Sequence, residues 1–204
     1  MMKTIILATQ NKDKVKEVKQ IMSDMNINII TMQEAGIDID VVEDGETFEA
    51  NAIKKAEEIM KISGQIVLAD DSGLEIDYFD KAPGVYSARY LGKDTPYQEK
   101  NAIILERMKE APESKRGARF VCAIAAAFPD KKMLDQTIVT KGIIEGRIGD
   151  QPRGSGGFGY DPIFYPEGFD TSTADISPEL KNKISHRGRA LEDMKIQLKR
   201  IMGN

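Results

Sequence analysis

What the chain lacks excludes several classes of site. It has one cysteine and one histidine among its 204 residues, so it forms no intramolecular disulfide and builds no zinc site of the usual His/Cys kind. The cysteine, Cys122, stands in the apolar run FVCAIAAAF, which indicates a small buried core residue. No apolar run is long enough to cross a bilayer, and the first residues lead directly into a strand pattern without a signal peptide. We therefore expect a cytoplasmic protein without a membrane partner.

The chain also lacks a surplus of basic charge. It carries 29 basic and 33 acidic residues, for a net charge of −4. A general nucleic-acid binder normally shows a basic surplus, so we expect no nucleic-acid partner. An anionic small ligand is compatible with this balance if its positive partners are local. The length and the hydrophobic content of 41% are those of one globular domain, or of two small lobes, with a substantial core.

Two common phosphate-binding motifs are missing as well. The sequence contains no GxxxxGK[ST] loop. Gly154, Gly156 and Gly159 have the spacing of a dinucleotide fingerprint, but that motif needs an apolar strand before it and a helix after it. Here the polar segment 150–153 precedes it and Asp-Pro follows it. We therefore expect no dinucleotide site of this kind.

The stretch from Ile66 to Tyr90 organises the rest of the chain. The apolar run Ile66–Ala69 predicts a buried strand, which we expect to stop at Asp70, Asp71, Ser72 and Gly73. Two adjacent carboxylates at a strand end can gather around a hard cation. The same four residues are also typical of a hairpin turn. The sequence leaves both interpretations open.

Strand and helix patterns alternate along the chain. We expect strands at 4–8, 27–31, 119–128 and about 133–144, and helices at about 12–25, 48–63, 95–111 and 189–202. Thr95-Pro96-Tyr97-Gln98 is a capping-box signature for the third helix, and Pro129–Lys132 predicts a hairpin between the last two strands. The alternation together with a hairpin predicts an α/β fold with a mixed sheet.

Two polar turns precede the first two helices. In TQNKDK, residues 9–14, the backbone N–H groups at the helix start and Lys14 favour an anion; alternatively Asn11 only caps the helix and Lys14 is solvated. The second turn places Glu43, Glu46 and Glu49 near a helix N-terminus. They are either plain first-turn residues, or one of them reaches a metal ion.

Two further segments carry candidate binding groups. In GGFGYDPIF, residues 156–164, the glycines allow close backbone approach while Phe158, Tyr160 and Asp161 offer flat faces and an acceptor for a planar base. The alternative is a Gly-rich loop with its aromatic rings in the core. KNKISHRGR, residues 181–189, gathers donors at the start of the final helix, as an anion clamp or as a solvated basic loop.

The segments TQNKDK, EDGETFEANA, LADDSGL, PGVYSARY, GFGYDPIF and KISHRG follow one another across nearly the whole chain. In this order they resemble the motifs of the inosine triphosphate pyrophosphatase family. The resemblance implies Mg²⁺-dependent hydrolysis of ITP, dITP and XTP to the monophosphate and pyrophosphate, which cleans the nucleotide pool, by a homodimer. It also implies a single elongated α/β domain over residues 1–204, with helices flanking a mixed sheet and two lobes around a central nucleotide cleft.

The same resemblance implies roles for individual residues. Glu43 and Asp71 would serve Mg²⁺, with Asp71 also the general base. The implied substrate contacts are Thr9, Gln10, Asn11, Lys12, Asp13, Lys14, Ser72, Phe158, Gly159, Tyr160, Asp161, Lys181, His186 and Arg187. The chain departs from the family pattern in two places. Gln10 stands where many relatives have Gly, and Phe79–Ala82 replaces a more Gly-rich segment before PGVYSAR.

Two other functions are weighed against this one. The first is a pyrophosphatase for modified pyrimidine nucleotides, and the second is a nucleotide-binding sensor without turnover. Pyrophosphate release from dITP in the presence of Mg²⁺ separates both from a purine nucleotide pyrophosphatase.

Overall fold

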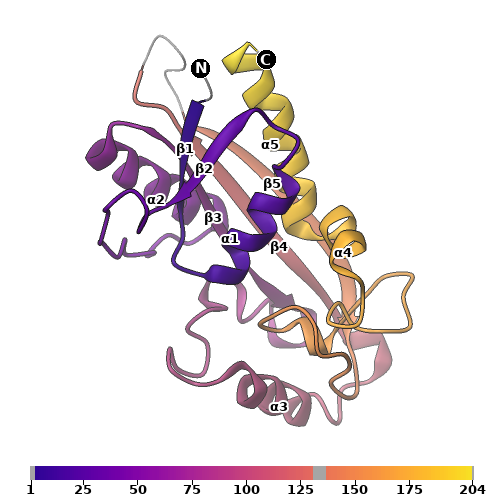
Figure 1. Cartoon of the computed structure of the whole chain (residues 1–204). Coiled ribbons are helices and arrows are strands. Elements are labelled where there is room, and N and C mark those ends of the chain that lie inside the picture. Colours follow the sequence, from indigo (N-terminus) through magenta and orange to yellow (C-terminus); the bar gives the residue numbers. More distant parts are fainter. Residues whose placement is uncertain (1–2, 131–136, 204) are drawn as a thin grey trace. The chain divides into compact units, whose positions relative to one another are not determined.

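A computed structural model describes residues 3–130 and 137–203. Its strands are β1 (Lys3–Ala8), β2 (Ile27–Thr31), β3 (Ile66–Ile76), β4 (Gly117–Ala127), β5 (Ile138–Ile148) and β6 (Phe164–Pro166), and its α-helices are α1 (Lys12–Ile21), α2 (Phe48–Ser63), α3 (Tyr97–Arg107), α4 (Pro178–Ile184) and α5 (His186–Met202) (Figure 1). The strand order in the sheet is β2-β1-β3-β4-β5-β6. Since β1 pairs in parallel with β2 and β3 while β5 pairs antiparallel with β6, the predicted α/β fold with a mixed sheet is confirmed.

The chain divides into two compact units. The first comprises Met1–Asp71, Cys122–Gly142 and Arg187–Asn204, and the second comprises Ser72–Val121 and Ile143–His186. Strands β3, β4 and β5 therefore contribute residues to both units. That the chain forms one domain with two lobes around a cleft stays a prediction.

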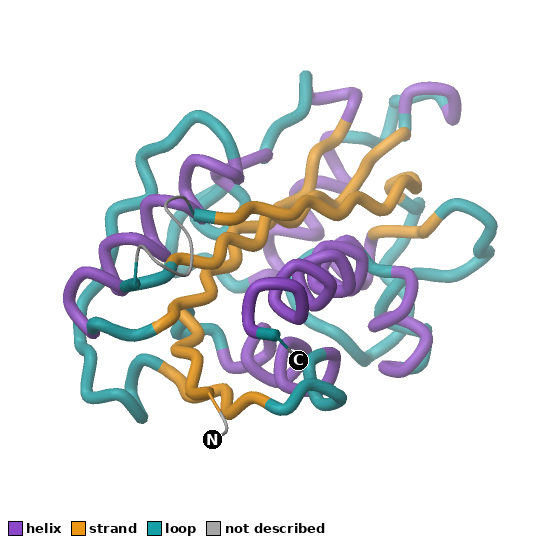
Figure 2. Tube along the Cα trace, turned by 90° about the horizontal axis from the view of Figure 1, so that it is seen from above, coloured by secondary structure: helices purple, strands orange, loops and turns teal. Residues whose placement is uncertain are grey.

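In the first unit, helices lie on both faces of the strands. Side chains alternate along a strand, and one face carries Ile5 and Leu7 of β1 with Ile66 and Leu68 of β3, packed against α1 and α5. Figure 2 shows the helix that ends at the C-terminus on one side of the strands. Helix α2 lies on the other face (Figure 1), with a buried stripe of Phe48, Ala52, Ala56 and Ile59. Cys122 belongs to the core of this unit and is fully buried, as predicted.

The second unit has its own core. Leu74 and Ile76 from β3 pack with Phe120 from β4 and with Ile104 and Met108 from α3 and its C-terminal turn. Phe164 packs against Phe120 with ring centroids 4.6 Å apart. Among the described residues, no helix is both long and apolar enough to cross a membrane.

The expected end of β3 is wrong. The strand does not stop at Asp70 but continues through Asp71 and Ser72 to Ile76, so neither a strand end nor a hairpin turn occurs there. Because successive side chains of a strand point to opposite faces, Asp70 faces α1 and α5 whereas Asp71 faces α2. The two carboxylates therefore do not gather around one cation.

Several helix boundaries differ from the sequence prediction. The first helix ends at Ile21 rather than near residue 25. The third begins at Tyr97 without a capping box, because the Thr95 hydroxyl donates to the carbonyl of Leu91 (2.7 Å) and Pro96 is the N-cap. The final helix begins at His186, and the short α4 before it was not predicted.

The last two predicted strands are present with different limits. The last predicted strand, β5 in the structure, reaches Ile148 instead of residue 144. Its expected start near Met133 and part of the hairpin at Pro129–Lys132 lie outside the described residues.

Candidate active site

The strand order of the first unit indicates where a ligand would bind. The chain leaves β1 through α1 to β2 on one side, then returns through α2 to β3 on the other side. Open α/β sheets bind ligands at such a reversal, outside the carboxyl ends of the strands. Ala8 of β1 is paired with Ala69 of β3, so the loop that begins at Thr9 follows β1 beside Asp70.

That loop forms the predicted strand-to-helix turn. Asn11 caps α1, because its Oδ1 accepts hydrogen bonds from the backbone N–H groups of Asp13 (2.9 Å) and Lys14 (3.1 Å). The Thr9 hydroxyl accepts one from the N–H of Asn11 (3.2 Å). The capping interpretation of Asn11 is thus confirmed, and these hydrogen bonds hold the turn.

Asp70 is the centre of a buried ion-pair network. It is 0% exposed; its Oδ1 accepts from the Lys14 ammonium at 2.5 Å and its Oδ2 from Nε of Arg187 at 2.7 Å. Arg187 is 1% exposed and also pairs with Glu17 through Nη1. The two cations and two anions sum to zero charge. Lys14 is therefore held by a carboxylate, and the interpretation as a solvated lysine is wrong.

This network keeps Asp70 ionised. Burial alone would raise the pKa of its carboxyl, but the neighbouring Arg187 and Lys14 lower that pKa well below its ordinary value. For Lys14 the balance has the opposite sign: burial lowers the pKa of the ammonium, and Asp70 raises it above its ordinary value. We conclude that Asp70 holds Lys14 and Arg187 in place rather than binding a metal ion.

Asp71 lies in a different environment on the α2 face. It is 6% exposed, and its Oδ2 accepts a hydrogen bond from Nδ2 of Asn51 (3.0 Å). Burial raises the pKa of Asp71 to about 6, with a further rise from the negative charge of Glu43 and opposing effects of Lys14 and Lys55. A carboxylate with a pKa near 6 is suited to accept a proton close to neutral pH.

Helix α2 holds the acidic turn against β3. Lys55 donates to the Glu43 carboxylate and to the backbone carbonyl of Asp70 (2.9 Å), and Asn51, one helical turn earlier, accepts from the N–H of Gly45 (2.7 Å). The sequence patterns did not single out Asn51 or Lys55 as site residues. Asn51 could have been recognised from the sequence, because it is a polar residue three positions after Phe48 and lies on the apolar stripe of the helix.

The carboxylate oxygens of Glu43 and Asp71 are ligands of the kind that a hard cation prefers. Glu43 and Asp71 supply only oxygen ligands, and the Glu43 charge contributes to the raised pKa of Asp71, as expected for carboxylates that share a site. The part of the chain that the structure describes has no group of three or more His, Cys, Asp or Glu side chains placed to hold a metal. Mg²⁺ usually keeps several waters and takes one or two protein carboxylates. The two carboxylates of Glu43 and Asp71 are therefore enough to hold it.

In the second unit, Asp161 organises the Gly-rich loop. Its Oδ2 accepts from the N–H of Phe158 (2.7 Å) and from the Lys181 ammonium (2.6 Å), and Thr173 donates to Oδ1 (2.8 Å). Gly157 is required there, because its φ is +67° and a Cβ would lie 2.3 Å from Asp161 Oδ2. Asp161 thus shapes the loop and neutralises Lys181.

The two aromatic residues of this loop differ in exposure. Tyr160 is 3% exposed, donates its hydroxyl to the carbonyl of Ser87 (2.8 Å) and packs edge-on against Tyr97. Phe158 is half-buried, with the Lys181 ammonium 5.0 Å from its ring centroid. The core interpretation therefore holds for Tyr160, whereas Phe158 is only partly buried. A substrate contact by either residue stays a prediction.

The basic segment is not a solvated loop. Lys181 and His186 are each 6% exposed, and the His186 ring stacks on Phe120 with centroids 4.8 Å apart and planes at 14°. The Arg187 guanidinium is occupied by Asp70 and Glu17. Of the other predicted contacts, Thr9, Ser72 and Gly159 are half-buried, and Gln10, Asn11, Lys12 and Asp13 are exposed.

The two departures from the family pattern have different structural consequences. Among the described residues, Asp80 (φ 50°), Lys81 (φ 73°) and Leu91 are the non-glycine residues with positive φ. Gln10 needs no glycine-like conformation, so its side chain is accommodated. Asp80 and Lys81 occupy the left-handed region that favours glycine, so a more Gly-rich segment would adopt this backbone with less strain.

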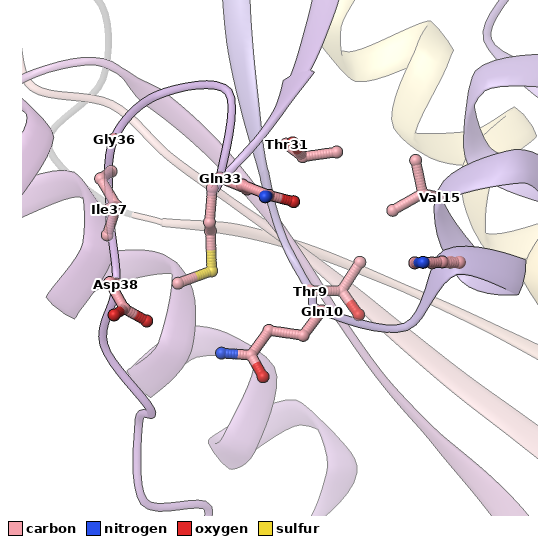
Figure 3. Close-up of a pocket in the computed structure, with 10 residues that line it drawn as sticks. Thr9, Gln10, Val15, Thr31, Gln33, Gly36, Ile37 and Asp38 are labelled. Carbon is pink, nitrogen blue, oxygen red and sulfur yellow. The ribbon is translucent and has the colours of Figure 1, made fainter.

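A pocket of about 650 Å³ lies in the first unit beside the loop after β1. It is lined by Thr9, Gln10 and Lys12 and by residues of the segment after β2, among them Gln33 and Ile37. Figure 3 shows the Gln10 side chain extending from its loop across this space towards Asp38. The pocket therefore opens next to the predicted phosphate-binding turn.

Comparisons with known proteins agree with the architecture and the motifs. The model of the Ham1 family matches residues 5–197. The chain is 48% identical to a dITP/XTP pyrophosphatase from Clostridium perfringens (98% of this chain, 100% of that protein) and 42% identical to one from Bacillus subtilis (95% and 96%). Solved Ham1 structures from Coxiella burnetii (TM-score 0.87, 41% identity, 98% and 100% covered) and Staphylococcus aureus (0.84, 39%, 97% and 98%) share its fold. The chain belongs to the Ham1 family.

Proposed function

We propose that this protein is a nucleoside triphosphate pyrophosphatase that hydrolyses ITP, dITP and XTP with Mg²⁺ and so removes non-standard purine nucleotides from the pool. The observation that carries the proposal is the buried Asp71 carboxylate, with its pKa near 6, beside Glu43 at the switch point of the sheet. Relatives named dITP/XTP pyrophosphatase at up to 48% identity support the substrate class. Pyrophosphate release from dITP by the purified protein is the test.

Each charged group has a part in this reaction. Water attacks phosphorus, the bond between the α- and β-phosphates breaks, and the products are the monophosphate and pyrophosphate. Asp71 accepts the proton of the attacking water. Lys14, fixed by Asp70, and Lys55 supply positive charge to the polyphosphate. Glu43 and Asp71 would hold a bound Mg²⁺, which would neutralise phosphate charge and polarise the attacked phosphorus.

We expect activity to require an added divalent cation. Two carboxylates bind Mg²⁺ weakly by themselves, so most of its affinity comes from the complex with substrate. EDTA should stop pyrophosphate release from dITP, excess Mg²⁺ should restore it, and the circular dichroism spectrum should not change. Full activity in EDTA would remove the metal from the proposal.

We also expect the chemical group at the 6-position of the purine base to decide which nucleotides are accepted. Hypoxanthine and xanthine carry a 6-oxo acceptor there, whereas adenine carries an amino donor. If His186, by side chain or backbone N–H, and the backbone N–H of Arg187 present donors to this position, adenine leaves buried donors unpaired. In that case kcat/KM for dITP and XTP should exceed that for dATP at least about a hundredfold.

Guanine shares the 6-oxo group, so we expect dGTP to be rejected through its 2-amino group near Phe158–Asp161. Sugar discrimination should be slight, and ITP serves as the matched control for dITP. Equal kcat/KM for dATP and dITP would show that the 6-position is not read. Turnover of modified pyrimidine triphosphates alone, or binding of dITP without turnover, would favour one of the two other functions.

We further propose a homodimer. It is implied by the family resemblance alone, because methionines such as Met22, Met108 and Met194 are buried in the cores of the two units. The nucleotide is the other partner that we assign.

A further inference from the structure

Asn51 joins two segments that are far apart along the chain. It lies in α2 and is 0% exposed. Its Nδ2 donates to Oδ2 of Asp71 on β3 (3.0 Å), and its Oδ1 accepts from the N–H of Gly45 (2.7 Å), two residues after Glu43. One side chain therefore fixes both the strand that carries Asp71 and the turn that carries Glu43.

The orientation of this amide follows from hydrogen-bond chemistry. The Gly45 N–H can only donate, so the oxygen of Asn51 must face it and the NH₂ group must face Asp71. The Asp71 carboxylate thus receives its hydrogen bond on Oδ2. Within the described part of the chain, the structure gives Asp71 Oδ1 no such bond, which leaves Oδ1 to water or a cation.

Gly45 is fitted closely to this amide. A Cβ on Gly45 would lie 2.8 Å from Oδ1 of Asn51, so the turn approaches the helix as closely as a glycine permits. Lys55, on the next turn of α2, holds Glu43 itself. Contacts with α2 therefore place the acidic turn, and Gly45 within the turn makes the close approach possible.

We propose that Asn51 is a positioning residue that orients Asp71 for proton abstraction and sets the spacing between Asp71 and Glu43. The inference rests on the proposed function, since it assigns Asn51 to the same site. It predicts that Asn51 acts through Asp71, whereas a residue with only a structural role would act independently of it.

A double-mutant cycle tests this coupling. We expect Asn51→Ala to lower kcat for dITP about 10- to 100-fold, because loss of such an outer partner misplaces the reactive group. In the Asp71→Asn background, measured with a sensitive radiolabelled assay, the same change should cost less than about threefold. Equal factors in the two backgrounds would overturn the proposal.

Asn51→Asp gives a second variant if the alanine protein does not fold. It keeps the acceptor for the Gly45 N–H but turns a carboxylate towards Asp71, so its loss of kcat should exceed that of Asn51→Ala. In the Asp71→Asn background a hydrogen bond between positions 51 and 71 is restored, and Asn51→Asp should again cost little. A lower kcat in both backgrounds by the same factor would contradict the assignment.

A binding measurement provides a readout that does not depend on turnover. Calorimetric titration of Mg²⁺ into protein with a non-hydrolysable α,β-imido analogue of dITP should show about tenfold weaker Mg²⁺ binding for Asn51→Ala. Unchanged Mg²⁺ affinity together with unchanged kcat would overturn the inference. If the parent protein binds Mg²⁺ and analogue but releases no pyrophosphate, the proposed function fails while this measurement still decides the role of Asn51.

Thr140→Val is the matched control. Thr140 is 9% exposed and donates one buried hydrogen bond to the carbonyl of Ala190 (2.7 Å) in the same unit, on a segment that carries none of the site residues. We expect kcat and Mg²⁺ affinity to change less than about twofold, and equally in both backgrounds. A coupling to Asp71 as large as that of Asn51 would mean that any buried hydrogen bond gives the effect.

Discussion

Asp71→Asn is expected to lower kcat for pyrophosphate release from dITP by about 10²- to 10⁴-fold, because an amide accepts no proton at neutral pH and is a poor ligand for Mg²⁺. The change keeps the shape of the side chain, and a flipped amide can still accept the hydrogen bond of Asn51. The rate is measured at saturating dITP and Mg²⁺. A variant with near-normal kcat would remove Asp71 from the mechanism.

The same variant should be folded and, near neutral pH, more stable than the parent in the absence of metal. The folded-state pKa of Asp71 is raised from an ordinary 3.8 to about 6, so the side chain contributes stability below pH 4 and loses it as the pH rises to 6. Above pH 6 the buried carboxylate therefore costs on the order of 1–3 kcal/mol that the amide does not. Thermal melts at pH 4 and pH 8 check this dependence.

Asp24→Asn is the matched control for both measurements. Asp24 lies in the same unit, and its side chain is 57% exposed beside Lys195. Its loss should leave kcat unchanged and should not reproduce the gain in stability at pH 8. If this variant also loses activity, the effect at Asp71 is not specific to the site.

Arg187→Met is expected to lower the free energy of unfolding by about 3–5 kcal/mol, because it leaves the buried Asp70 with one cation fewer. The methionine replaces most of the length of the arginine, so the loss reports charge more than volume. Urea denaturation, followed by circular dichroism, gives the free energy. Arg200→Met, on the exposed face of the same helix, is the control and should change it by less than about 0.5 kcal/mol.

The double variant Arg187→Met with Asp70→Asn separates ion pairing from packing. It removes one cation and one anion, which leaves Lys14 and Glu17 with balanced charge. We expect it to be more stable than Arg187→Met alone, since the unpaired buried carboxylate is gone. If the double variant loses as much free energy of unfolding as Arg187→Met and Asp70→Asn lose together, Asp70 and Arg187 are not coupled.

Local patterns in the sequence predicted much of the fold. The apolar spacing of 48–63 gave the limits of α2 correctly, and Asn11 was correctly interpreted as a helix cap. Both signals reach no further than one or two helical turns, so a single sequence is enough to read them. The segment Asp70–Gly73 gave a wrong prediction of a strand end because its signal is equally local. Its residues favour turns locally, but pairing with neighbouring strands keeps β3 extended to Ile76.

The sequence by itself determined which residues are present at the candidate site, since the six ordered motifs contain Lys14, Glu43, Asp71 and even Asn51. Only the tertiary structure decided where each of them lies and which groups it contacts. Arg187 reaches Asp70 across 117 positions of the chain, and no local spacing predicts such a pair. Because strand side chains alternate between faces, the extension of β3 sends Asp70 to the buried ion network and Asp71 to helix α2.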